Sequence, residues 1–165
     1  MTPEQTALLT KRQASFRESE ARRLPALIEF IGKIGIEPSH HVGTDPAAYL
    51  PHLSKVLATM PCDSDRERTI LSARVAEYVG EYFAQRFGGT WFVNDTPESA
   101  TFARYVVGRF LALPGSPVCI DPFDIGMKFA RLPVPRDLAG LLAEVERDFR
   151  IAVNANAPLQ DPPRS

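Results

Sequence analysis

The residues best suited to acid–base chemistry in this sequence are acidic, and two of them, Glu77 and Glu81, are four positions apart. In a helix this spacing puts both carboxylates on one face, where they can exchange protons or bind a cation. The sequence has no histidine at the helical offset of a di-metal site, so we expect Glu77 on a solvated surface. Glu81 lies between Gly80 and two aromatic residues. We expect it at the edge of the core, accepting hydrogen bonds from a strand or an arginine such as Arg104 or Arg109.

A second acidic pair, Asp121 and Asp124, forms a D-P-F-D motif between an expected strand and an expected helix. As chemistry, the motif is a pair of carboxylates facing a ligand. As structure, Asp121 caps the helix, Pro122 takes its first position and Asp124 interacts with the positive end of the helix dipole. Capping accounts for every residue of the motif, so we predict that Asp121 is a helix cap.

Trp91, the only tryptophan, is either a binding-site aromatic or a core residue. Its place in a short apolar strand favours the core, and a buried indole N–H needs an acceptor. The candidate binding residues are therefore Glu81, Trp91, Asp121 and Asp124.

Other kinds of site lack their sequence signals. His40, His41 and His52 do not have the spacing of a structural zinc site, so we interpret them as residues of a solvated loop and the helix after it. Cys62 and Cys119 are interpreted as small buried side chains in a reducing compartment. The sequence contains no nucleophile elbow, P-loop or dinucleotide fingerprint. We expect no catalytic residue, no metal and no cofactor.

The charge of the chain is nearly balanced, with 19 basic and 20 acidic residues among 165. A net charge of −1 argues against nonspecific nucleic-acid binding, although four arginines are close in sequence: Arg12, Arg17, Arg22 and Arg23. No apolar stretch approaches the roughly 20 residues that span a bilayer, and residues 1–13 lack a signal-peptide pattern. We expect a cytoplasmic protein whose partner is neither nucleic acid nor membrane.

These residues are positioned by helices at both ends of the chain and by one in its middle. The first helix begins at Thr2, and Pro25 interrupts its hydrogen-bond ladder by a kink or a new start. A long central helix is expected over residues 64–87 after a capping box. Gly80 inside it costs about 1 kcal/mol, which indicates that another element crosses closely there.

Short β-branched and aromatic segments predict an antiparallel meander of three strands. They are residues 90–94, 102–113 and 118–120. Together with a final helix over 135–153, they predict an α+β fold in which the central and C-terminal helices cover the small sheet. We expect one domain over 1–153, with a helical part over 1–60 and the helix–sheet–helix core over 64–153. Residues 154–165 are expected to be a disordered tail.

The motifs Y-V-G-E-Y-F, F-G-G-T-W and D-P-F occur in this order over residues 74–128. This pattern resembles small bacterial proteins of unknown function, some of which are similar to immunity proteins of toxin systems. The resemblance implies no catalytic residue.

We therefore expect a non-enzymatic bacterial protein that binds another protein, as an immunity or regulatory factor. The alternative is a small-molecule-binding protein or an enzyme with a carboxylate-lined cleft. That alternative requires Glu81, Asp121 and Asp124 to converge in one pocket between sheet and helices.

Overall fold

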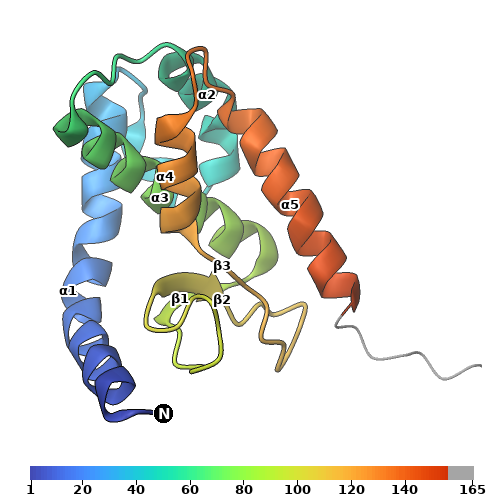
Figure 1. Ribbon diagram of the computed structural model, residues 1–165. Coiled ribbons are helices and arrows are strands. Elements are labelled where there is room, and N and C mark those ends of the chain that lie inside the picture. The colour runs from blue at the N-terminus through green and yellow to red at the C-terminus, as the bar shows by residue number, and fades with distance from the viewer. Residues whose placement is uncertain (156–165) are drawn as a thin grey trace, which may run out of the picture.

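The computed structural model describes residues 1–155 of the chain (Figure 1). They form an α+β fold with a small antiparallel sheet, as the sequence predicts. The α-helices and strands of this part are α1 (Pro3–Lys33), α2 (Leu50–Ala58), α3 (Asp65–Phe87), β1 (Thr90–Val93), β2 (Tyr105–Gly108), β3 (Cys119–Ile120), α4 (Pro122–Arg131) and α5 (Leu138–Ala155). The tail predicted over 154–165 begins inside α5 and otherwise lies outside the described residues.

Helix α3 is the centre of the fold, and local sequence determines both of its ends. The Ser64 hydroxyl accepts a hydrogen bond from the Glu67 N–H at 3.1 Å, and the Glu67 carboxylate accepts one from the Ser64 N–H at 2.9 Å. This is the predicted capping box. The helix ends at Gly88, whose φ of 64° lies in the left-handed region. Every residue from 75 to 83 is buried, so α3 is shared by the helical and the sheet parts of the core.

The three-stranded sheet has β2 in its middle, antiparallel to both neighbours. Trp91 lies opposite Val107, which lies opposite Ile120, so these three residues share one face of the sheet. Strand β2 is shorter than the predicted segment 102–113. The reason is that Ala103 and Arg109 have φ values of 57° and 53°, and a left-handed residue does not continue a β-ladder.

Helix α1 is continuous along one side of the molecule (Figure 1). No new helix starts at Pro25, which lies inside α1. The C-terminal part of α1 is anchored in the core by Leu27 and Ile31. Its N-terminal half lies beside the sheet, where the rings of Phe16 and Tyr105 are 5.5 Å apart. Helix α1 therefore lies alongside β1 and β2.

Helices α2 and α5 complete the core. Helix α2 directly follows a short 3-10 helix, Pro46–Tyr49. Helix α5 packs against α2. Its Phe149 ring lies 4.7 Å from the rings of both Phe87 and Phe110, which joins α5 to the end of α3 and to the loop after β2. None of the described helices is long and apolar enough to span a membrane.

Candidate functional site

A groove runs between the N-terminal half of α1 and the body of the protein. It consists of two adjoining hollows of about 440 Å³ and 350 Å³, which share Ser19, Tyr105 and Phe123. We call it the α1 groove and define it by its arginine and aromatic side chains. These are Arg12, Arg22, Arg23, Arg74, Arg104, Phe16, Trp91, Tyr105 and Phe123. They come from α1, α3, both longer strands of the sheet, the turn before β2, and α4, so only the tertiary fold brings them together.

Arg23 lies at the inner side of the α1 groove and makes two contacts with the body. Its Nε donates to Glu81 Oε1 at 3.2 Å, and its guanidinium carbon is 4.2 Å from the centre of the Trp91 ring. The Arg23 and Glu81 side chains are only 12% and 11% exposed. An ion pair in such a buried setting holds both side chains in place. The partner of Glu81 is thus an arginine, as expected, but it is Arg23 of α1 rather than Arg104 or Arg109.

Glu77 also lines the groove, and the prediction that it faces solvent is wrong. Its side chain is 12% exposed, because α1 covers this face of α3. Arg74 Nη1 donates to both carboxylate oxygens, at 2.6 and 2.5 Å. Burial raises the pKa of Glu77, and the positive charge of Arg74 opposes that rise. Glu77 and Glu81 therefore share a helix face, each with its own arginine.

Trp91 connects the groove to the core. It is 8% exposed, and its ring packs on Gly80 so closely that a Cβ atom at that glycine would lie 1.7 Å from Cζ2. Gly80 is therefore the close crossing that the sequence predicts, with a side chain of β1 as its partner. The expected acceptor for the buried indole N–H is absent among the described residues. Trp91 is therefore both a core residue and part of the groove, although the sequence analysis treats these two interpretations as alternatives.

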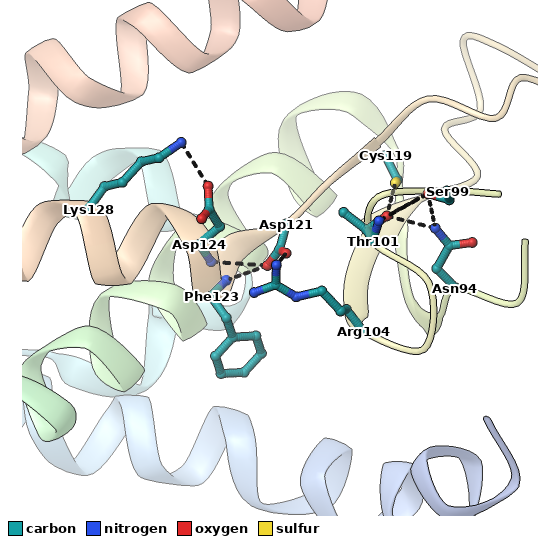
Figure 2. A network of polar contacts seen from close by, with 9 residues as sticks. All are labelled: Asn94, Ser99, Thr101, Arg104, Cys119, Asp121, Phe123, Asp124 and Lys128. Carbon is teal, nitrogen blue, oxygen red and sulfur yellow. Dashed lines mark hydrogen bonds and ion pairs between the residues drawn. The ribbon is translucent and has the colours of Figure 1, made fainter. Parts of the chain in front are cut away.

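Tyr105 attaches α1 to the sheet. Its hydroxyl is 2.8 Å from the Ser15 hydroxyl and donates to the Arg12 carbonyl at 3.3 Å. The Phe123 ring, 6.4 Å from the Tyr105 ring and 6.1 Å from the Trp91 ring, points from the start of α4 toward α1 (Figure 2). The aromatic side chains of the groove are thus one connected row.

Asp121 and Asp124 lie at the start of α4, outside the α1 groove (Figure 2). Asp121 Oδ1 accepts hydrogen bonds from the N–H groups of Phe123 and Asp124, at 3.1 and 3.0 Å. Its Oδ2 pairs with Arg104 Nη1 at 2.9 Å, and Asp124 pairs with Lys128 at 2.8 Å. Asp121 is therefore the helix cap that the sequence predicts.

The three candidate carboxylates do not converge. Asp121 and Asp124 line a shallow hollow beside α5, whereas Glu81 is paired with Arg23 next to the α1 groove. Neither hollow of the α1 groove is lined by Asp121 or Asp124, and the hollow beside α5 is not lined by Glu81. The same residues contain no group of three or more His, Cys, Asp or Glu side chains arranged to hold a metal ion.

A second polar cluster closes the loop between β1 and β2 (Figure 2). Asn94 is 5% exposed, and its Nδ2 donates to the hydroxyls of Ser99 and Thr101 at 2.9 and 2.7 Å. The Thr101 hydroxyl is 3.6 Å from Cys119 Sγ. These contacts pair the polar side chains of the loop with nearby groups of the protein. They thereby hold in place Arg104 and Tyr105, which follow the loop directly.

Comparison of the chain with protein-family models, with curated proteins and with solved structures finds no match. One feature of the sequence indicates the arginines of the groove, namely the cluster of Arg12, Arg17, Arg22 and Arg23. All of that cluster except Arg17 lines the groove. The rest of the groove had no local signal, because Arg74, Arg104 and Phe123 reach it from distant segments.

Proposed function

We propose that this protein is a non-enzymatic binding protein for another protein and that the α1 groove is its binding surface. The observation that carries the proposal is the composition of the groove. Five arginines and four aromatic residues line it, and arginine, tyrosine and tryptophan are the residues most enriched at the energetic centres of protein interfaces.

The positions of the carboxylates favour this proposal over a carboxylate-lined cleft. Glu77 and Glu81 are each neutralised by an arginine, and Asp121 accepts the backbone hydrogen bonds of a helix start. A general acid or base needs a carboxylate that is free to exchange a proton with a substrate. These groups have structural partners instead.

The kind of binding protein we propose is an immunity or regulatory factor of a bacterial cytoplasm. The support is the resemblance of the 74–128 segment to small bacterial proteins of unknown function, some of which are similar to immunity proteins of toxin systems. A factor that acts by association alone needs a binding surface rather than a catalytic centre. The two cysteines, Cys62 and Cys119, are not disulfide-bonded, which suits a reducing compartment.

Site-specific photo-crosslinking in the native host tests the proposal. A photoreactive residue at Ser19 lies in the groove, whereas one at Ala21 lies on an exposed part of α1 outside it. We expect one protein to cross-link from Ser19 and not from Ala21. That protein, once purified, should bind the unmodified chain at a fixed stoichiometry. Equal cross-linking from both positions, or no protein adduct from Ser19, would contradict the proposal.

A further inference from the structure

We infer that the α1 groove takes an acidic, extended segment of the partner, with a carboxylate on Arg23 and an apolar side chain on the aromatic row. This inference rests on the proposed function, because it names the partner chemistry for the same surface.

The walls of the groove are rich in guanidinium N–H groups that have no acceptor within residues 1–155. Arg22 pairs with Glu18, and Arg104 pairs with Asp121 through Nη1 alone. Arg12 has no side-chain partner in the described part of the chain. Each guanidinium carries several N–H groups and no acceptor, so most of these donors are uncommitted. A ligand that supplies carboxylate oxygens matches them, and a basic ligand does not.

Arg23 is the arginine of the groove whose side chain is most preorganised to bind a carboxylate. Glu81 takes its Nε, and the guanidinium lies against the Trp91 ring. The two terminal amino groups of Arg23 make no other hydrogen bond within residues 1–155. Those two groups form the end of the guanidinium fork that binds a carboxylate in a bidentate manner. Because Arg23 is already held in place, binding of a carboxylate there costs little further side-chain entropy of Arg23.

The aromatic row adds an apolar contact beside the anion site. Phe16, Tyr105 and Phe123 are each half-buried and line the hollow next to Arg23. A free inorganic anion would contact the arginines and leave these rings exposed to water. A segment with an apolar side chain next to an acidic one uses both features, which is why the inference specifies both.

The length of the groove favours a segment over a small molecule. Arg12 and Arg22 lie ten positions apart on α1, which corresponds to about 15 Å along the helix axis. An extended peptide covers that distance with about four or five residues. Guanidinium N–H donors at both ends of the groove therefore match a short acidic stretch of chain.

Selection from a random peptide display library on the intact protein tests this inference. We expect the selected peptides to carry Asp or Glu next to an aromatic residue or leucine. Their affinity, measured by fluorescence anisotropy of the synthetic peptides, should fall about tenfold or more in Arg12→Glu at low salt. It should stay within about twofold in Arg17→Glu, the matched control, because Arg17 is exposed on the same helix but outside the groove. Thermal melts of both variants check that they fold alike.

The other outcomes separate the inference from the proposed function. Neutral or basic peptides that lose affinity in Arg12→Glu would overturn the acidic chemistry and leave the groove as the binding surface. Displacement of the selected peptides by inorganic phosphate alone would assign the groove to small anions and overturn the inference. A library that yields no binder also overturns it, and the cross-link from Ser19 then decides the proposed function independently.

Discussion

Gly80 is the residue on which the contact between α3 and the sheet depends. The Trp91 ring occupies the space where a side chain at this position would be, with Cζ2 only 1.7 Å from the site of a Cβ atom. The same ring forms part of the groove and lies under Arg23. A change at Gly80 therefore moves the floor of the binding surface as well as the core.

We predict that Gly80→Ala lowers the free energy of unfolding by about 1–3 kcal/mol through overpacking, although alanine is intrinsically the better helix former. Gly32→Ala is the control, because a Cβ atom there meets its nearest neighbour at an ordinary 3.4 Å. Gly32→Ala should be neutral or stabilising by up to about 1 kcal/mol. Urea unfolding measures both. Equal effects of the two changes would show that Trp91 does not restrict position 80.

Substitutions of Arg23 and Glu81 test whether the buried ion pair acts as one unit. Both side chains are nearly nine-tenths buried, so Arg23→Met leaves a buried carboxylate without a partner and should cost about 3–5 kcal/mol. The double variant Arg23→Met/Glu81→Met should recover most of that loss, because it buries no charge. Denaturant unfolding of the two single variants and the double variant provides the cycle. Additive losses would mean that the two groups are stabilised separately.

The C-terminal end of helix α2 depends on one distant arginine. Arg136, in the turn before α5, is 5% exposed and donates from Nη1 to the carbonyls of Met60 and Leu57, at 2.8 and 3.3 Å. Its backbone N–H donates to the Ala58 carbonyl at 2.9 Å. Carbonyls at a helix end lack partners within the helix, so Arg136 both closes α2 and attaches the start of α5 to it.

We predict that Arg136→Met lowers the free energy of unfolding by about 2–3 kcal/mol, since it removes charged hydrogen bonds to buried carbonyls. Arg131→Met is the control, because Arg131 is exposed at the end of α4 and its side chain makes no hydrogen bond or ion pair among the described residues. That change should stay within about 0.5 kcal/mol. Hydrogen exchange should show faster opening of α2 in Arg136→Met. Unchanged protection of α2 would contradict the role of Arg136.

Across the fold, the features that the sequence predicts correctly are those that local chemistry determines. The ends of α3, the cap at Asp121 and the close crossing at Gly80 each depend on a few neighbouring residues, and each prediction is confirmed. The shortness of β2 was missed, because left-handed backbone at Ala103 and Arg109 has no glycine to signal it.

The groove could not be predicted, because its members come from segments far apart in the chain. The incorrect prediction that Glu77 faces solvent has the same cause. Its burial results from the packing of α1 over α3, and only tertiary structure brings Arg23 within 3.2 Å of Glu81, 58 positions later. The fold class follows from the order of elements, whereas a surface shared by α1, α3, the sheet and α4 depends on how they pack.

The most direct test of the proposed binding surface is the indole N–H resonance of Trp91 in a two-dimensional ¹H–¹⁵N NMR spectrum. The chain has a single tryptophan, so this peak is unambiguous, and the Trp91 ring lies beneath Arg23 in the groove. Addition of a selected acidic peptide should shift this peak, together with the backbone peaks of Ser19 and Tyr105, and should leave the peaks of α5 in place. An unmoved indole peak, with the shifts gathered on α2 or α5, would contradict the assignment of the α1 groove as the binding surface.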